Sequence, residues 1–375
     1  MKISSNFDGG NIHCLACSSP SDIRLEICSD NESKFFQWFY FRLNSVAGED
    51  CILKIVNAAA AAYPQGWVNY RAVASYDRDD WFRVATDYDG KTLTIRHRPE
   101  YDSVYYAYFA PYSMERHHDL LARMLASPLV RLEALGETLD GQDIDLLTIG
   151  TPETSKHNLW AIARQHPGET MAEWWMEGFL DRLLDKDDPV ARAVLNTATF
   201  YVVPNMNPDG SRRGHLRTNA AGINLNREWQ EPSLNRSPEV YVVRQRMEEI
   251  GVDFCLDVHG DEAIPHNFIA GPEGVPSFSK RQKTLLAGFK DALLQSNPDF
   301  QTEHGYPPNN PGNANLKIGA NWIAERFGCI SMTLEMPFKD IADGTQQRQG
   351  WSPERSRKLG RSNLDAIYAV MQDLR

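Results

Sequence analysis

Hydrophobic and polar positions divide the chain into two regions with different periods. Up to about Pro111, short runs of aromatic and β-branched residues are separated by turns of Asp, Gly, Asn and Pro. These runs are IRLEIC, FFQWFYFRL, CILKIVNA, YRAVASY, WFRVATDY, KTLTIRH and SVYYAYFA. Short strands at such intervals are typical of an antiparallel β-sandwich. We therefore predict an all-β sandwich domain over residues 1–112.

A helical pattern follows the last of these runs. In the segment SMERHHDLLARMLAS, residues 113–127, apolar side chains recur at helical spacing and fall on one face: Leu120, Leu121, Met124 and Leu125. This spacing predicts an amphipathic helix. We expect it to bridge the sandwich and the region that follows.

From residue 128 to 375, apolar runs with the character of strands alternate with helical segments. The predicted strands are IDLLTIG, NLWAIAR, TATFYVVP, FCLDVHG, NFIAG and ISMTLEMP, and helices are predicted after Thr170, Pro238, Ser279, Ile318 and Ser352. This alternation predicts an α/β domain with a mixed, mostly parallel sheet flanked by helices. The segment 301–315, QTEHGYPPNNPGNAN, predicts a long loop, and loops of this length often act as functional lids.

Composition and charge narrow the classes of function. The 375 residues are 42% hydrophobic, and 39 Lys and Arg stand against 50 Asp and Glu, for a net charge of −11. An acidic chain disfavours nucleic acid and anionic membrane surfaces as partners. An anionic substrate would therefore need a local basic cluster.

The N-terminal segment and the cysteines indicate the compartment. MKISSNFDGGNIHC lacks the apolar stretch of a secretory signal, and no run approaches the length of a membrane span. The six cysteines are too sparse for a disulfide scaffold, so we expect reduced thiols and a cytoplasmic protein. Cys14 and Cys17 form a CxxC beside His13 that could bind metal, but no second pair stands at zinc-ribbon spacing.

Polar residues follow several of the predicted strands of the α/β region. In an open α/β sheet, ligands bind outside the carboxyl ends of the strands. His166 and Glu169 follow NLWAIARQ, His259 ends FCLDV and Glu335 ends SMTL. Residues three apart at the start of a helix share a face, so His166 and Glu169 can converge on one ion.

Two imidazoles and one carboxylate form the ligand set of an open, catalytic zinc site. His259 completes this set with His166 and Glu169, and Glu335 stays free to act as general base. Each residue also has a structural interpretation. An HxxE pattern is weak, a histidine at a strand end is often structural, and a glutamate after a strand is often solvated. Spacing alone leaves both interpretations open.

The motifs HPGE, NPDG, LRTNAAGINLNR, DVHG and TLE, in this order, resemble the zinc metallocarboxypeptidases of the carboxypeptidase A type. The stretches WFYFRL and DSVYYAYFAPYS are similar to the N-terminal β-sandwich of the cytosolic carboxypeptidase subfamily. The resemblance extends over most of the chain. It implies a carboxypeptidase-like catalytic domain preceded by the sandwich.

The resemblance also implies roles for individual residues. His166, Glu169 and His259 match the ligands of one zinc ion per chain, and Glu335 matches the general base. Arg217, in HLRTN, matches the arginine that stabilises the oxyanion. The remaining pair, Asn226 and Arg227 in NLNREW, matches the residues that bind the terminal carboxylate of the substrate. Without the resemblance, Arg212, Arg213 and Arg217 could instead form an exposed basic loop, and Asn226 could cap a turn.

The chain departs from the family at two positions. The family has an aspartate two residues before the Asn-Arg pair, bonded to the first zinc histidine, and here this residue is Asn224. An amide adds less basicity to the imidazole, so metal affinity could be lower or another carboxylate could substitute. Asp257 is a candidate for that carboxylate, or it is a structural residue. The family also has a mobile tyrosine about twenty residues before the general base. No tyrosine lies between Asn310 and Glu335, and Tyr306 is the nearest candidate.

Substrate preference is expected to depend on the segment NLKIGANW, which matches the floor of the pocket for the last side chain. Lys317 could select a C-terminal Glu or Asp, as the resemblance to polyglutamate-trimming enzymes implies. Alternatively, Lys317 is a solvated residue at a helix start.

We therefore expect a zinc-dependent carboxypeptidase that removes single C-terminal residues from peptides or proteins, with acidic tails as candidate substrates. The alternatives are a zinc amidohydrolase of N-acyl amino acids and a catalytically silent peptide-binding module. Oligomeric state is open.

Overall fold

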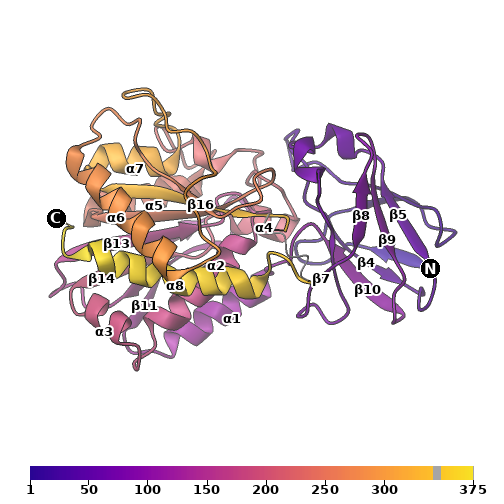
Figure 1. Cartoon of the computed structure of the whole chain (residues 1–375), viewed down its shortest axis with the longest axis horizontal. Helices are drawn as coiled ribbons and strands as arrows, with labels where there is room; N and C mark the ends of the chain where they lie inside the picture. Colours follow the sequence, from indigo (N-terminus) through magenta and orange to yellow (C-terminus); the bar gives the residue numbers. More distant parts are fainter. Residues whose placement is uncertain (341–347, 375) are drawn as a thin grey trace.

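A computed structural model describes residues 1–340 and 348–374 and shows two units side by side (Figure 1). The N-terminal unit contains two five-stranded sheets. The first has the order β1 (Lys2–Ser4), β4 (Tyr40–Asn44), β10 (Ser103–Ala107), β6 (Val73–Ser75) and β7 (Phe82–Arg83). The second has the order β2 (His13–Ala16), β3 (Ile23–Glu26), β5 (Cys51–Ile55), β9 (Leu93–His97) and β8 (Ala85–Tyr88). Two 3₁₀ turns, η1 (Ala58–Ala60) and η2 (Pro64–Trp67), follow β5.

The predicted all-β unit is confirmed, and seven of its strands lie within the predicted runs. Neighbouring strands pair antiparallel, except that β3 and β5 are parallel. Alternate residues of β5 are buried, namely Cys51, Leu53 and Ile55, because successive side chains of a strand point to opposite faces.

Helix α1 (Met114–Leu125) occupies the predicted bridge. The Ser113 side chain accepts a hydrogen bond from the backbone of Arg116 and caps the first turn. Leu120, Leu121 and Met124 are buried as expected, but Leu125 is 42% exposed. Leu125 therefore lies outside the apolar face on which we placed it. The domain limits after residues 112 and 127 stay predictions.

The C-terminal unit contains one seven-stranded mixed sheet. Its order is β11 (Val130–Glu137), β12 (Asp143–Ile149), β14 (Ala198–Val203), β13 (His157–Ala163), β15 (Phe254–Asp261), β17 (Ile330–Pro337) and β16 (Phe268–Ala270). The four neighbouring strands β14, β13, β15 and β17 are parallel to one another. Strand β12 pairs antiparallel with β14 on one side, and β16 pairs antiparallel with β17 on the other. Strand β11 was not predicted.

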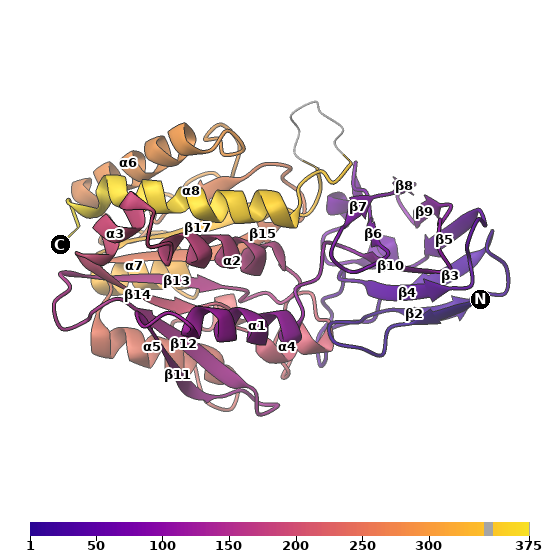
Figure 2. The same ribbon diagram turned by 90° about the horizontal axis from the view of Figure 1, so that it is seen from below.

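Helices cover both faces of this sheet (Figure 2). One face carries α2 (Met171–Leu183), α3 (Pro189–Leu195), α6 (Lys280–Ser296) and α8 (Pro353–Met371), and the other carries α5 (Pro238–Ile250) and α7 (Gly319–Phe327). Strand β13 packs against the helices on both faces of the sheet. Leu159 and Ala161 belong to the cluster with α2 and α8, whereas Trp160 and Ile162 pack with α5 and α7. Two short elements, α4 (Pro208–Arg213) and η3 (Leu225–Arg227), follow β14.

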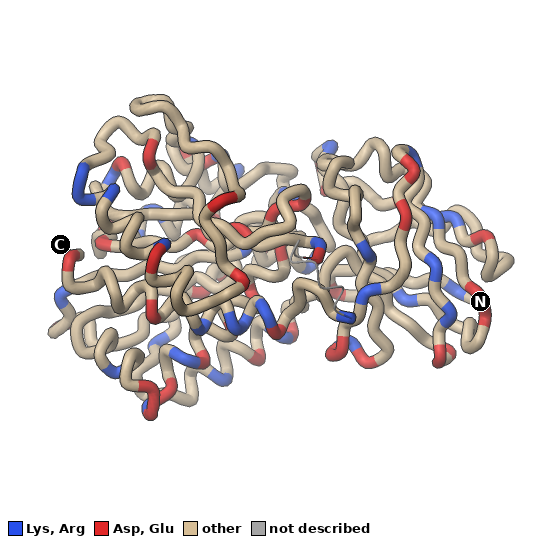
Figure 3. Tube along the Cα trace, viewed as in Figure 1, with Lys and Arg blue, Asp and Glu red and all other residues tan. Residues whose placement is uncertain are grey.

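The predicted helix starts and the predicted loop are confirmed. Ser279 forms a capping box with Gln282, and the Ser352 side chain accepts a hydrogen bond from the backbone of Arg355. Residues 301–315 contain neither helix nor strand. Lys and Arg are interspersed with Asp and Glu along the trace (Figure 3). Among the described helices, none has the length and apolarity needed to cross a bilayer.

A buried ionic network joins α1 and α2 at the end of β13. Glu173 lies between His117, with its Oε1 2.7 Å from Nδ1, and Arg164, whose Nη1 donates to Oε2 at 2.7 Å. Arg164, held at a positive φ of 59°, also donates to the carbonyl of Pro167. Asp145 lies 3.4 Å from Nε2 of His117. The network therefore braces the segment that follows β13.

This network predicts a loss of stability at alkaline pH. Burial lowers the pKa of His117, but the carboxylates of Glu173 and Asp145 outweigh it and raise the pKa to about 9. A raised pKa contributes stability that is complete below the unfolded value of about 6.5 and is lost as pH rises through about 9, worth about 3 kcal/mol. Thermal unfolding from pH 6 to pH 10 should show the decline. His117→Asn should flatten it, and an unchanged pH profile in that variant would refute the role of His117.

Candidate metal centre and substrate cavity

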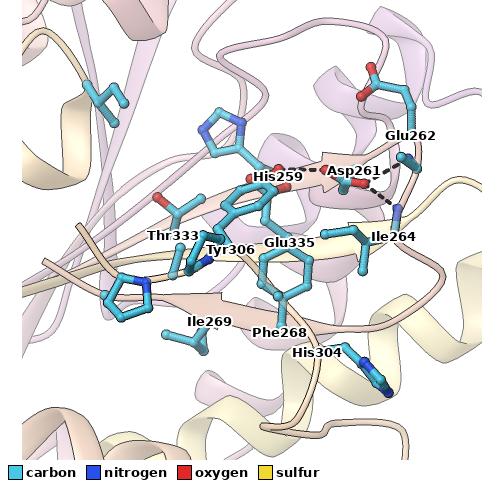
Figure 4. Close-up of a pocket in the computed structure, with 18 of the residues that line it drawn as sticks. His259, Asp261, Glu262, Ile264, Phe268, Ile269, His304, Tyr306, Thr333 and Glu335 are labelled. Carbon is cyan, nitrogen blue, oxygen red and sulfur yellow. Dashed lines mark hydrogen bonds between the residues drawn. The ribbon is translucent and has the colours of Figure 1, made fainter. Parts of the chain in front are cut away.

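A cavity of about 950 Å³ lies at the carboxyl ends of β15 and β17 (Figure 4). Its lining includes residues of both strands, the loop segment 300–309, and Tyr63 and Gln65 of the N-terminal unit. The predicted long loop thus forms one wall, and the sandwich contributes to another.

Three adjacent parallel strands position the predicted site residues. His166 and Glu169 lie in the turn between β13 and α2, His259 lies in β15 and Glu335 lies in β17. His259 and Glu335 are register partners in neighbouring strands. The carboxyl ends of parallel strands meet at one edge of a sheet, so residues distant in sequence come together there.

The three predicted ligands converge. The Nδ1 atoms of His166 and His259 lie 3.2 Å apart, and the Glu169 carboxylate lies 2.7 Å from the first and 2.8 Å from the second. In residues 1–340 and 348–374, this is the only group of three or more His, Cys, Asp or Glu residues close enough to share a metal ion. Two nitrogens bound to one tetrahedral zinc ion lie about 3.4 Å apart. The donor set therefore fits zinc.

The second nitrogen of each histidine contacts a side-chain oxygen. His166 Nε2 lies 3.1 Å from Oδ1 of Asn224, and His259 Nε2 lies 3.0 Å from Oδ1 of Asp257. Such contacts fix the ring orientation of a metal-binding histidine. The substitution of Asp257 for the missing aspartate at His166 is therefore wrong. Asp257 contacts His259 instead.

Electrostatics favour the metal-binding form of His166. Burial and the guanidinium of Arg217 lower its pKa to about 4, so the imidazole is neutral at neutral pH. Metal ions bind the neutral imidazole. The backbone N–H of Gly260 donates to Glu169 at 3.0 Å, which stabilises the carboxylate as an anion.

Glu335 faces the cavity beside these ligands but is not one of them. Its side chain is almost fully buried, and burial raises its pKa well above the usual range. Oε2 has no hydrogen-bond partner within the described part of the chain. A buried carboxylate oxygen without a partner is available to a water molecule or a substrate group.

Tyr306 lies in the cavity wall close to Glu335 (Figure 4). Its hydroxyl donates to Oδ2 of Asp261 at 2.6 Å and lies 3.5 Å from Oε1 of Glu335. Burial and these carboxylates raise the pKa of the phenol, which therefore keeps its proton. The expected tyrosine position in the loop is thus compatible with contact to a bound substrate.

The predicted cations Arg217 and Arg227 both line the cavity, as does Asn226. Neither guanidinium forms a salt bridge with a described residue, and burial and Arg217 lower the pKa of Arg227. Oδ1 of Asn226 accepts the backbone N–H of Gly319 at 2.8 Å, which fixes the amide. Arg213, by contrast, lies outside and pairs with Asp140. Arg217 is thus not part of an exposed basic loop.

Lys317 does not lie in the cavity. It is exposed, and its backbone precedes the first turn of α7. The alternative of a solvated residue at a helix start therefore agrees with the structure. Lys290 of α6 lines the cavity instead, 3.9 Å from Glu273.

Several cavity residues were not predicted from the sequence. Asp261 is the last residue of the strand that carries His259 and Glu262 follows it, so the same strand-end argument could have found them. Burial and the nearby Glu169 raise the pKa of Glu262 to about 8. No sequence pattern indicates Tyr63 or Lys290. Tyr63 belongs to the N-terminal unit and Lys290 to α6, and neither follows a strand that carries a predicted ligand.

Comparison with known proteins gives two family matches. Residues 3–109 match the cytosolic carboxypeptidase N-terminal domain, and residues 117–354 match zinc carboxypeptidase. An uncharacterised protein of Zymomonas mobilis is 54% identical over 373 residues, which cover 100% of this chain and 97% of the relative.

Two solved structures share the whole fold. A putative carboxypeptidase A from Shewanella denitrificans is 53% identical with a TM-score of 0.98, over 100% of both chains. A metallo-carboxypeptidase from Pseudomonas aeruginosa, in complex with (2-guanidinoethylmercapto)succinic acid, is 45% identical with a TM-score of 0.98, also over 100% of both chains. The chain belongs to the zinc carboxypeptidase family and carries the N-terminal domain of the cytosolic carboxypeptidases.

Proposed function

We propose that the chain hydrolyses the C-terminal peptide bond of peptides or proteins, with one zinc ion held by His166, Glu169 and His259. The convergence of their donor atoms within 4.8 Å, on the wall of a cavity that also exposes Glu335, Arg217 and Arg227, carries this proposal. A closed structural site would leave no cavity beside the ligands.

Zinc, when bound, supplies a Lewis acid that polarises the scissile carbonyl and lowers the pKa of a water molecule. In its ionised form, Glu335 accepts a proton from the attacking water and returns it to the leaving amine. Arg217 stabilises the negative charge that develops on the carbonyl oxygen. Its guanidinium is fixed before the reaction, so little reorganisation is needed when the charge forms.

Arg227 and Asn226 bind the terminal carboxylate of the substrate. A guanidinium offers two parallel N–H donors to a carboxylate. Nη1 of Arg227 donates to the backbone carbonyl of Asn226 at 2.6 Å, and no carboxylate of the described residues pairs with this guanidinium. A terminal carboxylate is present only at the end of a chain. This contact would restrict cleavage to the last residue, and Tyr306 adds a hydroxyl beside it.

The cavity also contains a cation for an acidic substrate side chain. With Arg217 and Arg227 assigned, Lys290 is available, and we assign to it the selection of a C-terminal Glu or Asp. The relative from Pseudomonas aeruginosa binds a molecule with two carboxylates and one guanidino group. The cavity of this chain has cationic side chains for two carboxylates of such a molecule. It also contains an acid, Glu273, which lies beside Lys290.

Paired lysine variants test this preference. We expect Lys290→Met to lower kcat/KM about tenfold for a peptide ending in Glu and to change it little for one ending in Phe, since only the first loses a charged contact. Lys317→Met should leave both values unchanged. A wild-type preference for C-terminal Lys or Arg would contradict the assignment.

A panel of substrates tests the reaction itself. Peptides ending in Glu, Asp, Lys, Phe or Ala and a set of N-acyl amino acids should be assayed with zinc-loaded protein. Release of single C-terminal residues supports the proposal. Hydrolysis of acyl amino acids alone would indicate an amidohydrolase, and binding of peptides without hydrolysis would indicate a silent module.

A further inference from the structure

Asp30 of the N-terminal unit reaches into the loop that carries Arg217. Its carboxylate accepts the backbone N–H groups of three successive residues, Leu216 at 2.7 Å, Arg217 at 2.8 Å and Thr218 at 2.9 Å. The Thr218 hydroxyl also donates to it, at 3.1 Å. Asp30 is only 2% exposed. All four of these hydrogen bonds to its buried carboxylate come from the catalytic unit.

The backbone around Asp30 is itself fixed. The N–H of Asp30 donates to the carbonyl of Phe35 at 2.8 Å, which closes residues 30–35 into a tight loop. The neighbouring Asn31 contacts both flanks of the Arg217 segment, through Nε2 of His215 at 3.1 Å and the carbonyl of Ala220 at 2.7 Å. This loop thus holds the segment 215–220 at several points.

The same unit also contacts the side chain of Arg217. Its guanidinium carbon lies 5.6 Å from the ring centre of Phe35 and 5.4 Å from that of Tyr63. Cations are attracted to aromatic faces at such distances. The backbone and the guanidinium of Arg217 are therefore both held from across the boundary between the two units.

The Arg217 segment needs this support because it has no regular structure of its own. Residues 215–219 lie between α4 and η3, outside any helix or strand. Their buried N–H groups need acceptors, and an ionised carboxylate is a strong one. Without Asp30, the loop would lose the acceptor that orders three consecutive amides.

We propose that Asp30 is a positioning residue for the reaction, so that the N-terminal unit completes the active site. This inference rests on the proposed role of Arg217 at the scissile carbonyl. A guanidinium stabilises a developing charge only where it is already correctly placed. Asp30 acts through Arg217 and does not itself touch the substrate.

A double-mutant cycle tests this coupling. Asp30→Asn keeps the shape but replaces one acceptor oxygen by a donor, so kcat should fall about 10-fold to 100-fold while KM changes less than about threefold. In an Arg217→Ala background, the same substitution should lower kcat no further. Additive effects, or no effect in the wild-type background, would overturn the inference.

The matched control is Asp89→Asn. Asp89 accepts the backbone N–H groups of Lys91 and Thr92 in an exposed turn of the same unit, at 2.8 Å and 2.7 Å. This variant should leave kcat unchanged. An equal loss of activity in both variants would also overturn the inference, because a general weakening of the N-terminal unit would then explain it.

Hydrogen–deuterium exchange of the zinc-loaded full chain provides a readout that does not depend on activity. Asp30→Asn should raise the exchange rates of the amides of Leu216, Arg217 and Thr218 at least about tenfold, while amides of β17 keep their protection. Unchanged exchange in the loop would overturn the inference. If the wild-type chain hydrolysed no peptide, the proposed function would fail, yet the exchange result would still decide whether Asp30 orders this loop.

Discussion

Replacing Glu335 by glutamine is expected to lower kcat about a thousandfold while the protein keeps its zinc. Glutamine has nearly the same shape, so the substitution leaves no gap in the packing. It cannot accept a proton from water, so only the general base is removed. Glu335 is not among the three converging ligands, and metal affinity should therefore change little. Metal content by mass spectrometry and kcat on a peptide substrate should be measured on the same preparation.

Glu137→Gln is the control for this substitution. Glu137 is exposed in the outer strand β11, far from the cavity lining, and its loss should leave kcat unchanged. If Glu335→Gln kept more than about a tenth of the wild-type kcat, another group would have to act as general base. Loss of zinc in that variant would instead show that Glu335 is a ligand.

His259→Ala is expected to abolish both zinc binding and hydrolysis. Nδ1 of His259 lies 3.2 Å from that of His166 and 2.8 Å from Glu169, so the substitution removes one of three donors. Two protein ligands hold zinc much more weakly than three. We expect the zinc content of the dialysed variant to fall below about a tenth of the wild-type value.

His13→Ala is the matched histidine control. His13 stands beside Cys14 and Cys17, the second sequence pattern with ligands for a metal. These residues do not form a metal-binding group in the described part of the chain, so zinc content should be unaffected. If His259→Ala retained its zinc and His13→Ala lost it, the metal site would have been assigned to the wrong unit. Thermal unfolding of both variants shows whether they fold.

The sequence predicted those elements whose signals are local. Ser279 and Ser352 cap helices through contacts within three residues, and the strand that carries His259 begins with the buried apolar run Phe254–Leu256. Strand β11 was missed although Val130, Leu132 and Ala134 alternate with charged residues, because it is the outer strand, is largely exposed and has no continuous apolar run. Patterns of hydrophobicity report burial, and edge strands have little of it.

The residues of the candidate site also differ in whether the sequence could predict them. The ligands His166, Glu169 and His259 could be found because strand ends and family motifs mark them. Lys317 was a candidate for the pocket because of its distance from Glu335 in sequence, but α7 begins just after it and it is exposed, as in the alternative of a solvated residue at a helix start. Asp30 gave no signal, since its partners are about 187 residues away and bind it through backbone N–H groups, which any sequence provides.

Diffraction at the zinc absorption edge is the most direct test of the metal centre. For crystals of the purified chain, an anomalous difference map should show one strong peak in contact with Nδ1 of His166, the carboxylate of Glu169 and Nδ1 of His259. Glu335 should lie outside bonding distance of that peak. A hydrolytically active preparation whose crystals have no peak at these atoms, or a peak elsewhere in the chain, would contradict the account.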